Sequence, residues 1–576
     1  LGVPSSSSDA AAAASDAVRL FADRAAMARA GFSVSAANLE PVAEICRRLD
    51  GIPLAIELAA ARVTAMSPAE IGQRLDERFR LLTGARRDRV ERHQTLRSTV
   101  EWSYSLLDDR ERAVFDRVGV FVGGFTAAAA EAVVADDDIE AWDVVEGLTS
   151  LVEKSMVLAE EEAADGTTRY RLLETMRAFA REKLDANDQT DHWRRRHAAY
   201  YATFAEEAGR ALSGPDELPW VRRLEADFDN IRAALRWGAD APEQADADLA
   251  LRIIIGLAQF GPRVSWGMGG WAEMLAPRAR ASTLDDRTLV LTHAGSWHVL
   301  RDELEQAQEL AREALGVVDD PSPRAVSWSY FVLASATYRQ GDTSGGLELI
   351  AEAHGALDAQ HAEPRYHADL HGLASLLLLS VGDLEGAGRE ADAMLEIARL
   401  RHNPTTMAGA LGYVGRARFT EDPGGALAAL EESIALTRAG AADGFYTIVL
   451  AGASQLRARA GDRQGALEDL RAAIAFDHDM GQRSGVGLTI ERAVAILSSS
   501  RDDELAAMCF GIVQSGAVTR FRSLPQVDRT AARLGERMGT DAYEAAVARG
   551  AALGAEEVVP ALLAELDRLL AAASSA

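Results

Sequence analysis

The apolar positions between Val18 and about Val90 recur at the three- and four-residue spacing of amphipathic helices. The clearest apolar face is made by Leu39, Val42, Ala43, Ile45, Cys46 and Leu49. Gly51 and Pro53 then interrupt the pattern, and the mostly apolar stretch 54–63 predicts a buried helix. Ser67-Pro68-Ala69-Glu70 combines a capping box with a proline at the first helical position, which predicts a further helix. This region is therefore predicted to be a helical subdomain.

Residues 94–190 combine predicted helices with two short β-leaning runs. The runs Ser155–Leu158 and Arg169–Leu173 flank Asp165-Gly166, which is a typical hairpin turn. A helix over Glu174–Leu184 is expected to follow. Several helices followed by a β-hairpin predict a winged-helix domain.

Regularly spaced aspartates mark an internal repeat after about residue 246. They are Asp302, Asp342, Asp383, Asp422 and Asp462, at intervals of 40, 41, 39 and 40 residues. Three residues beyond the last four stand Gly345, Gly386, Gly425 and Gly465, followed by Gly346, Ala387, Ala426 and Ala466. Gly-Asp and similar turns end one helix and cap the next, and a small residue at a fixed place lets two helices approach closely. A helix-turn-helix unit at a fixed period is typical of an α-solenoid, here with a period longer than the ~34 residues of the tetratricopeptide repeat.

The expected fold class is therefore mainly α, with a helical subdomain, a winged-helix domain with a small β-hairpin, and an α-solenoid of tetratricopeptide-like repeats. The predicted segments are a flexible low-complexity start (1–17), the helical subdomain (18–93), the winged-helix domain (94–190), a helical connector (191–245), the repeats (246–520) and a C-terminal helical cap (521–576).

The charge balance disfavours nucleic acid as a partner. Lys and Arg number 61 against 88 Asp and Glu, a net charge of −27, and such a surface repels a phosphate backbone. The only cysteines, Cys46 and Cys509, are too few for a disulfide framework. No apolar run is long enough to cross a membrane. A cytoplasmic location is expected, and the oligomeric state stays open.

Lysine is confined to Lys154 and Lys183, and neither follows a glycine. The chain therefore lacks the G-x-x-x-x-G-K-[ST] loop that binds nucleotide phosphates. It also lacks an H-E-x-x-H zinc helix and a G-x-S-x-G nucleophile elbow. We expect the chain alone to have no catalytic residues, no enzyme activity, no metal and no cofactor.

A series of motifs resembles one class of signalling protein. The stretch Arg47–Ala60, with Gly51-Ile52-Pro53-Leu54 at its centre, resembles the G-L-P-L segment of the NB-ARC class of signal-transduction ATPases. The chain is most similar to large actinobacterial regulators of the AfsR and LuxR-type kinds. Trp102–Leu107 and Val120–Phe125 resemble their winged-helix domain, and Leu224–Leu235 resembles the segment leading into their repeat sensor. The likeness covers essentially the whole chain.

The resemblance implies a P-loop core, a helical lid that carries the G-x-P-L turn, a winged helix and tetratricopeptide-like repeats. ADP would hold a closed form. A protein or small-molecule signal on the repeats would permit exchange for ATP and expose an output domain, usually a DNA-binding one. The core and the output domain are expected upstream of this chain.

The resemblance also implies adenine-nucleotide-binding residues, which would act only in an intact parent protein. Gly51, Ile52, Pro53 and Leu54 would contact the nucleotide from the lid, and Glu174 takes the aspartate position of the relatives' Met-His-Asp motif. Leu173 takes the histidine position, and leucine cannot make the histidine's contact to a phosphate. The alternatives are a helix-breaking turn for the first four residues and a charge favoured by the helix dipole for Glu174.

Three other clusters have competing interpretations. The arginine-rich stretch 74–97 could contact DNA or could form solvated salt bridges. His367 and His371 have the spacing of a helical metal pair, with His361 nearby, but no sequence rule supplies a third ligand. Trp266, Trp271, Trp297 and Trp328 could line a ligand groove, although core packing is expected for most of them.

Two functions follow from these observations. The first is the regulatory and sensor half of a nucleotide-switched ATPase, acting in transcriptional control. The second is a self-standing tetratricopeptide-like scaffold for protein–protein interaction without nucleotide control. A DNA-binding winged-helix repressor is disfavoured, because residues 1–200 carry a net charge of −8 and residues 201–576 one of −19.

Overall fold

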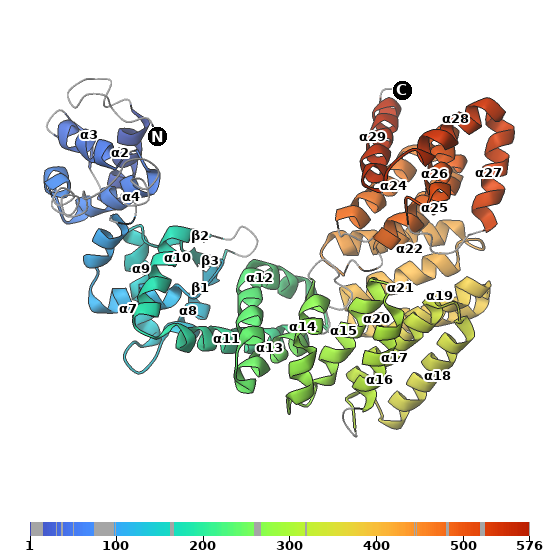
Figure 1. Cartoon of the computed structure of the whole chain (residues 1–576), viewed down its shortest axis with the longest axis horizontal. Helices are drawn as coiled ribbons and strands as arrows, with labels where there is room; N and C mark the ends of the chain where they lie inside the picture. Colours follow the sequence, from blue (N-terminus) through green and yellow to red (C-terminus); the bar gives the residue numbers. More distant parts are fainter. Residues whose placement is uncertain are drawn as a thin grey trace. The chain divides into compact units, whose positions relative to one another are not determined.

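A computed structural model of the chain shows two compact units (Figure 1). It describes residues 1, 15–29, 32–35, 38–49, 51–73, 97, 99–161, 166–257, 267–316, 320–442, 444, 446–479, 483–518 and 525–574. The first unit comprises residues 1–201 and 225–238, and the second comprises residues 202–224 and 239–576. Helices α11 (Thr190–Ala211) and α12 (Glu217–Asp240) therefore contribute to both units. Most of the expected start 1–17, most of the arginine-rich stretch 74–97, and Trp266 lie outside the described residues.

The first unit begins with the helical subdomain. Its elements are α2 (Asp16–Ala28), α3 (Leu39–Arg48), α4 (Pro53–Ala60) and the 3-10 helix η1 (Ala61–Thr64). Ser15 caps α2 by accepting a hydrogen bond from the backbone N–H of Val18. Gly51, between α3 and α4, has a φ of 65°, which glycine adopts without strain. Buried side chains from all three helices, such as Phe21, Ile45 and Ile56, form one apolar core.

The winged-helix domain follows within the same unit. After helical residues 99–105, its elements are α7 (Asp109–Val118), β1 (Phe125–Thr126), α8 (Ala127–Val134), α9 (Ala141–Glu153), β2 (Leu158–Glu161), β3 (Thr168–Arg171) and α10 (Glu174–Ala186). Strand β3 lies between β1 and β2 and pairs antiparallel with both.

The predicted hairpin is present, but its strands lie at different residues. Residues 155–157 are not a strand, because Ser155 has a φ of 57° and turns the chain out of α9. Pairing begins only at Leu158, opposite Arg171. The predicted turn residue Asp165 lies outside the described residues.

The second unit is a stack of paired helices (Figure 1). Its helices are α13 (Gln244–Gly256), α14 (Met268–Ala281), α15 (Thr288–Leu300), α16 (Leu304–Gly316), α17 (Pro323–Arg339), α18 (Thr343–Ala359), η4 (Pro364–His367), α19 (Ala368–Val381), α20 (Leu384–Arg401), α21 (Pro404–Ala417), α22 (Pro423–Arg438), α23 (Tyr446–Ala460), α24 (Arg463–Asp479), α25 (Arg483–Ser499), α26 (Asp503–Ser515), α27 (Pro525–Met538), α28 (Thr540–Ala551) and α29 (Ala555–Ser574). From α15 to α26 each odd-numbered helix packs against the next, and the odd-numbered helices pack against one another in order. This is the geometry of an α-solenoid.

The periodic aspartates cap the second helix of four pairs. Asp342, Asp383, Asp422 and Asp462 each accept a hydrogen bond from the backbone N–H of the glycine three residues later, at 2.8, 2.8, 3.0 and 2.9 Å. A Cβ atom at Gly425 would lie 2.1 Å from Asp422 Oδ2, so a larger residue would require the carboxylate to shift from its present position. The small residues that follow, Gly346, Ala387, Ala426 and Ala466, are buried.

The first aspartate of the series behaves differently. Asp302 does not cap a helix: it has a φ of 65°, precedes the start of α16 by two residues, and lies 3.5 Å from Arg339 Nη2. The repeat signature therefore begins one pair later than the spacing of the aspartates suggests.

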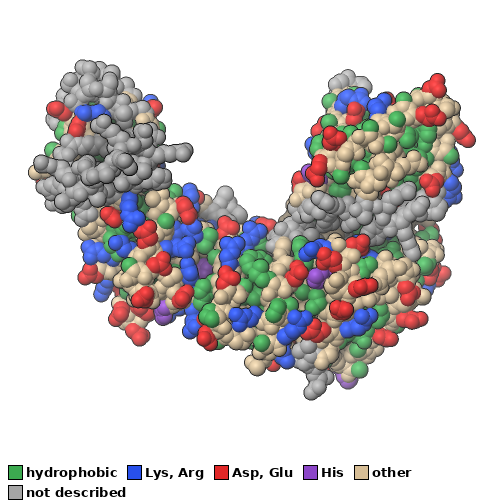
Figure 2. Space-filling view, in the orientation of Figure 1, with side chains coloured by type: hydrophobic (Ala, Val, Ile, Leu, Met, Phe, Trp, Pro, Cys, Tyr) green, Lys and Arg blue, Asp and Glu red, His purple; other side chains and the backbone are tan. Residues whose placement is uncertain are grey.

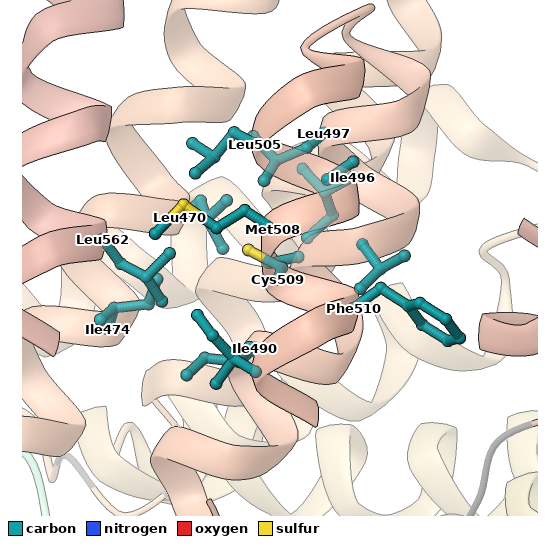
Figure 3. Packing of buried hydrophobic residues seen from close by; sticks show 14 of the residues in the cluster. Leu470, Ile474, Ile490, Ile496, Leu497, Leu505, Met508, Cys509, Phe510 and Leu562 are labelled. Atoms are coloured by element: carbon teal, nitrogen blue, oxygen red, sulfur yellow. The ribbon is translucent and has the colours of Figure 1, made fainter. Parts of the chain in front are cut away.

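An apolar core closes the C-terminal end of the second unit (Figure 3). Leu470, Ile490, Cys509 and Leu562 contribute to it from four different helices. Helices α26 and α28 cross with their backbones in contact, since a Cβ atom at Gly511 would lie 2.0 Å from the carbonyl oxygen of Val547. Burial raises the pKa of the Cys509 thiol to about 12, so this cysteine is a packing residue and not a nucleophile.

These elements confirm the predicted fold class: a mainly α chain with a helical subdomain, a winged helix with a small sheet, and a helical solenoid. In the described part of the chain, no helix has the length and apolar character needed to cross a membrane.

Candidate functional site

The predicted nucleotide-binding turn lies at the surface of the helical subdomain. Gly51 and Ile52 donate backbone hydrogen bonds back to α3, at 3.1 and 2.9 Å, which fixes the turn between α3 and α4. Gly51 is buried, Ile52 and Leu54 are half-buried, and Pro53 is exposed. Pro53 is therefore the member of this group whose side chain is most open to contact by another molecule.

Glu174 lies in the winged-helix domain, apart from that turn in the sequence and in a different subdomain. It is the first residue of α10, and its side chain is 79% exposed. Its carboxylate pairs with Arg177 at 2.8 Å, and this hydrogen bond holds the pKa of Glu174 below its usual range. Leu173 is the N-cap residue of α10 and makes no side-chain cap. These contacts are those of a charged residue in the first turn of a helix.

The Trp102–Leu107 motif links the helical subdomain to the winged helix. Trp102 is buried in the core of the helical subdomain. Two residues later, Tyr104 donates a hydrogen bond to Asp116 Oδ2 at 2.8 Å and packs edge-to-face on Phe179. Burial raises the pKa of Asp116 to about 7. The motif therefore holds the two subdomains together through one aromatic side chain on each side.

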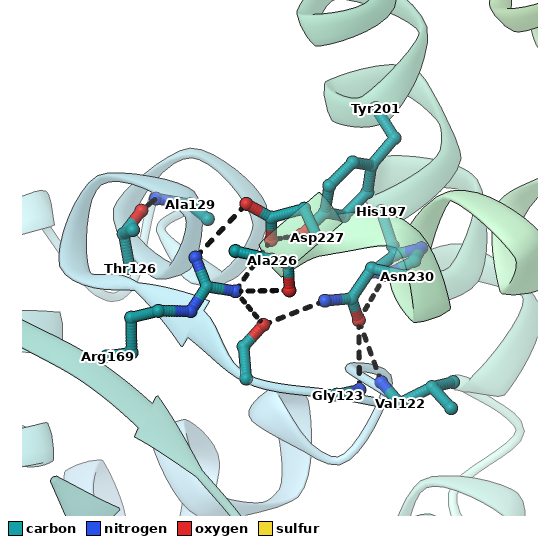
Figure 4. A network of polar contacts seen from close by, with 11 residues as sticks. Val122, Gly123, Thr126, Ala129, Arg169, His197, Tyr201, Ala226, Asp227 and Asn230 are labelled. Carbon is teal, nitrogen blue, oxygen red and sulfur yellow. Dashed lines mark hydrogen bonds and ion pairs between the residues drawn. The ribbon is translucent and has the colours of Figure 1, made fainter. Parts of the chain in front are cut away.

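A buried polar network joins the winged-helix domain to α12 (Figure 4). The two terminal nitrogens of Arg169 contact the carboxylate of Asp227 at 3.2 and 3.1 Å. Arg169 Nη2 also donates to the carbonyl oxygens of Gly124 and Ala226, at 2.7 and 2.9 Å. Tyr201 donates its hydroxyl hydrogen to Asp227 Oδ1 at 2.9 Å. This ion pair is largely buried, with side-chain exposures of 14% and 9%.

Asn230, one turn further along α12, is fully buried and completes the network (Figure 4). Its Oδ1 accepts hydrogen bonds from the backbone N–H groups of Val122 and Gly123, at 2.8 and 3.5 Å, and its Nδ2 donates to Gly124 O at 2.9 Å. The Nε2 atom of His197 lies 3.4 Å from Asn230 Oδ1. Burial lowers the pKa of His197 to about 4, so its imidazole is neutral at physiological pH.

The sequence did not reveal this network as one site. Val120–Phe125 and Leu224–Leu235 were predicted as separate motifs, yet the structure brings them into direct contact. The glycines allow the approach, since a Cβ atom at Gly123 would lie 3.3 Å from Asp229 Cβ, and one at Gly124 would lie 3.3 Å from Arg169 Nε. The available signals in the sequence were Gly123-Gly124 in one motif and Asp227 and Asn230 in the other. These two motifs are about a hundred residues apart, so neither pointed to the other.

The second unit contains a polar pocket of about 80 Å³. Its walls come from α17, η4, α19, α20, the start of α21, and the turn between α11 and α12. The lining residues are Leu212, Ser213, Glu217, Arg324, Ser327, Trp328, Arg365, Tyr366, Ala368, Asp369, Ile397, Arg401, Asn403, Thr405 and Thr406. None of these residues was a predicted site residue, except that Trp328 belonged to the tryptophan group.

One wall of the pocket is held by a complete set of hydrogen bonds. Arg401 Nη2 donates to the carbonyl oxygen of Ser213 at 2.6 Å. Glu217 of α12 accepts hydrogen bonds from Asn403 Nδ2 at 3.0 Å and from the backbone N–H of Thr405 at 2.9 Å. The turn between α11 and α12 is thereby fixed to the start of α21.

The opposite wall has unused hydrogen-bonding capacity. The Nε and Nη2 atoms of Arg324 and the Nε atom of Arg365 are buried and have no hydrogen-bond partner in the described structure. Burial lowers the pKa of Arg324 to about 10, an effect that nearby Asp286 opposes. The Arg365 guanidinium lies 4.6 Å from the centre of the Tyr366 ring. A buried donor without a partner is unfavourable, so these three nitrogen atoms could take further acceptors.

Asp369 adds a titrating group to the same pocket. It is the second residue of α19, and burial raises its pKa to about 6. The carboxyl group of Asp369 is therefore more readily protonated than an exposed aspartate.

The predicted histidine pair is part of a larger cluster. His367 and His371 lie beside His354 of α18, with ring centres 5.0 and 4.7 Å from it. His371 Nδ1 contacts Glu390 Oε2 at 2.6 Å, whereas His361 is exposed in a separate turn. Within the described ranges, no group of three or more His, Cys, Asp or Glu side chains is arranged to hold a metal ion. The cluster is a packed stack of rings.

Helix α9 precedes the hairpin, the position that recognition helices occupy in winged-helix folds. It carries Asp143, Glu146 and Glu153 and no basic residue. Lys154, just beyond its end, pairs with Glu111. On the face drawn in Figure 2, acidic and basic side chains are interspersed over the described surface. An acidic helix repels a phosphate backbone, which disfavours DNA contact through α9.

Comparison with known proteins supports the assignment of this domain. Residues 107–185 match the family model of the winged helix-turn-helix domain. This part of the chain is a winged-helix domain. The match runs from the residue before the α7 cap to the last turn of α10, so it includes Glu174 and Arg169 but not the network partners on α12.

Two curated mycobacterial proteins resemble longer parts of the chain. A Mycobacterium tuberculosis protein described as a "Putative HTH-type transcriptional regulator" is 40% identical over 321 residues, which is 53% of this chain and 36% of that protein. An uncharacterized protein of the same organism is 46% identical over 177 residues, which is 31% of this chain and 44% of that protein. The chain thus spans 36% and 44% of the length of these two relatives.

A solved structure also resembles the chain. It is a signal transduction ATPase with numerous domains and a tetratricopeptide repeat sensor from Pyrococcus horikoshii. It is 13% identical, with a TM-score of 0.48, over 90% of this chain and 74% of that chain.

Proposed function

We propose that the chain is the regulatory and sensor part of a nucleotide-switched signal-transduction ATPase that acts in transcriptional control. The repeat unit would bind a protein or small-molecule signal. The winged helix and the helical subdomain would pass that event to a P-loop core outside this chain. Similarity to an HTH-type transcriptional regulator and the order of the motifs along the chain support this proposal.

The observation that carries the proposal is the double role of α12. Glu217, in its first turn, holds the wall of the pocket in the repeat unit. Asp227 and Asn230, ten and thirteen residues later, hold the winged-helix domain. Both groups belong to the same helix. A ligand that moves the pocket wall would therefore act on the helix that also carries the network.

The exposure of the predicted nucleotide-binding turn is compatible with a nucleotide held mainly by a second domain, the P-loop core. Pro53 is exposed on a fixed turn, as a residue that packs on an adenine ring from the lid would have to be. ATP or ADP would bind only in the intact parent, because the chain has no P-loop to hold phosphates. In this proposal the winged helix is a coupling module, and DNA binding belongs to an output domain elsewhere in the parent.

The experiment is recovery of the native gene product from its source cells with an antibody raised against this chain. The proposal expects a product considerably longer than 576 residues. Denaturation of that product should release ADP or ATP, measured by chromatography. The matched control is the purified 576-residue chain, which should release no nucleotide and hydrolyse none. Hydrolysis of ATP by the control chain would overturn the proposal that nucleotide is bound and hydrolysed by a core outside this chain.

A scaffold without nucleotide control is the second candidate, and one observation favours it. Leu173 stands where the resembled family has a phosphate-contacting histidine, and Glu174 is engaged with Arg177. A native product of about 576 residues that carries no nucleotide would support the scaffold.

A further inference from the structure

The pocket of the repeat unit contains an arginine whose side chain is not fully paired by the described residues. Two buried nitrogen atoms of Arg324 and one of Arg365 lack hydrogen-bond partners in the described structure. In the same pocket, Arg401 is paired, since its Nη2 atom donates to the carbonyl oxygen of Ser213 at 2.6 Å. An unpaired buried guanidinium is costly, so its presence in a pocket wall points to a ligand group that completes it.

The geometry of a guanidinium narrows the chemistry of that group. Arginine donates several N–H bonds in a planar fork, which matches the two oxygens of a carboxylate. The acidic side chains nearby do not supply all of these oxygens. Glu217 is engaged with Asn403 and Thr405, and Glu363 contacts Arg365 Nη2 at 3.2 Å but leaves Arg365 Nε without an acceptor. Asp286 acts electrostatically on Arg324 but accepts no hydrogen bond from its Nε or Nη2 atom. Asp369 does not accept a hydrogen bond from these unpaired nitrogen atoms either, and burial raises its pKa to about 6. Among the described residues these three nitrogen atoms have no acceptor, and a ligand could supply one.

The remainder of the pocket indicates what the carboxylate is attached to. Trp328 lies one helical turn beyond Arg324 on α17, and the ring of Tyr366 lies beneath the Arg365 guanidinium. Ile397 of α20 adds an aliphatic surface. Aromatic and aliphatic walls beside an anion-binding group are suited to a ligand with an apolar or aromatic portion next to its acid.

We infer that this pocket binds a carboxylate carried by an apolar or aromatic group, with Arg324 and Arg365 as the carboxylate-binding residues. The carboxylate could belong to a small organic acid or to the C-terminal residue of a peptide. The inference rests on the proposed sensor role and names the chemical class of its signal. It does not depend on nucleotide, because the pocket lies wholly within the repeat unit.

The test measures the thermal unfolding of the full 576-residue chain with four probes. These are phenylacetate, phenylacetamide, the peptide N-acetyl-Ala-Ala-Phe and its C-terminal amide. A ligand that binds only the folded chain raises Tm by mass action, so at about 10 mM the two carboxylates should raise Tm by roughly 2 °C or more. The amides have the same shape without the charge and should have little effect. A larger shift with phenylacetate identifies a small acid, and a larger shift with the peptide identifies a chain terminus.

The decisive variant is Arg324→Met, with Arg418→Gln as its matched control. Arg418 lies on the same solenoid, is exposed, and pairs with Asp392 at 2.8 Å outside the pocket. Arg324→Met should abolish the carboxylate-dependent shift, whereas Arg418→Gln should retain it. Arg324→Met should also raise the Tm of the ligand-free chain, because it removes an unpaired buried charge.

Three results would overturn the inference. These are equal shifts with carboxylates and amides, a full shift in Arg324→Met, and a lower Tm of ligand-free Arg324→Met, which would indicate a purely structural arginine. Absence of any shift in the wild-type chain counts against it as well. None of these outcomes affects the release of nucleotide from the native product. Failure of the carboxylate-binding inference can therefore be distinguished from failure of the proposed nucleotide-switched function.

Discussion

The network around Asp227 and the pocket around Arg324 both place arginine side chains away from solvent, and they treat them differently. In the network, Arg169 donates to one carboxylate and two backbone carbonyl groups, and Asn230 is satisfied at both ends. In the pocket, Arg324 keeps two buried nitrogens without partners. A buried polar group left unpaired costs about 1–3 kcal/mol. The complete network therefore stabilises the contact between the winged-helix domain and α12. The incomplete one at Arg324 is expected where a ligand supplies the missing acceptor.

The largest effect is expected when the network is broken at its centre. Asp227→Ala leaves the Arg169 guanidinium buried without its counter-charge and removes the acceptor of Tyr201. Removing one partner of a buried ion pair costs about 3–5 kcal/mol, so the first unit should lose about 3 kcal/mol of unfolding free energy. Urea unfolding followed by circular dichroism measures the loss, and hydrogen exchange of residues 122–126 locates it. Asp229→Ala, an exposed neighbour on α12, is the control and should change little. A loss below about 1 kcal/mol would show that the network adds little to stability.

A smaller effect is expected from pH on the same network. The pKa of His197 is about 4 in the folded chain because of burial, and about 6.5 when the chain is unfolded. The unfolded state therefore binds the proton more readily, and stability that is present above pH 6.5 is lost as pH falls toward 4. Between pH 7 and pH 5 the loss should be about 2 kcal/mol.

Comparison of wild type with His197→Gln isolates this contribution. Asp116 lies in the same unit and acts in the opposite direction, because its raised pKa of about 7 adds stability as pH falls below that value. The difference between the two proteins cancels the Asp116 effect. Urea midpoints at pH 7 and pH 5 provide the measurement, and parallel pH slopes for the two proteins would refute the assignment to His197.

In the repeat unit, the capped turns offer a test of about 1 kcal/mol. Gly425→Ala would place a Cβ atom 2.1 Å from Asp422 Oδ2 and so displace the capping carboxylate, at a cost of up to about 1 kcal/mol, the value of a helix cap. The adjacent Gly424→Ala is the control, since its Cβ would meet the same carboxylate only at 3.8 Å. Alanine is the better helix former, so the control should be neutral or slightly stabilising. Equal losses for the two variants, measured by urea unfolding, would remove the special role of the capping glycine.

The smallest expected effect is a gain in stability, whereas Asp227→Ala and Gly425→Ala are expected to destabilise the chain. Arg324→Met should raise the unfolding free energy of the ligand-free chain by about 0.5–1 kcal/mol, because the unpaired charge is replaced by an apolar side chain of similar length. The same substitution at the network, Arg169→Met, should be destabilising, because it leaves the buried Asp227 carboxylate without its counter-charge. Opposite signs in urea unfolding are the outcome that separates the two sites, and equal signs would erase the distinction.

Much of the fold could be predicted from the sequence because its signals are local. The aspartate caps form their hydrogen bonds within three residues, so their period was visible as a repeat. The hairpin was predicted, but its strands shifted because Ser155 adopts a positive φ that no residue pattern announced. Asp302 fitted the period and yet does not cap a helix.

The two polar sites could not be predicted, because their partners are distant in the sequence. Gly124 and Asn230 are 106 residues apart, and Ser213 and Arg401 are 188 apart. Arg324 was one of 59 arginines, and nothing in its neighbourhood along the chain separated it from those that pair on the surface. The predicted nucleotide residues Gly51–Leu54 and Glu174 rest on a family resemblance, and they stay a prediction.

The self-contained caps of the solenoid have an evolutionary consequence. Each of the four capping aspartates is satisfied by a glycine of its own turn, so the start of a helix does not depend on which pair precedes it. Recombination that adds or deletes a whole repeat would carry the start signal with it and leave the neighbouring turns intact. The array could then lengthen or shorten between lineages, changing what it recognises, while the joint to the winged helix is inherited unchanged.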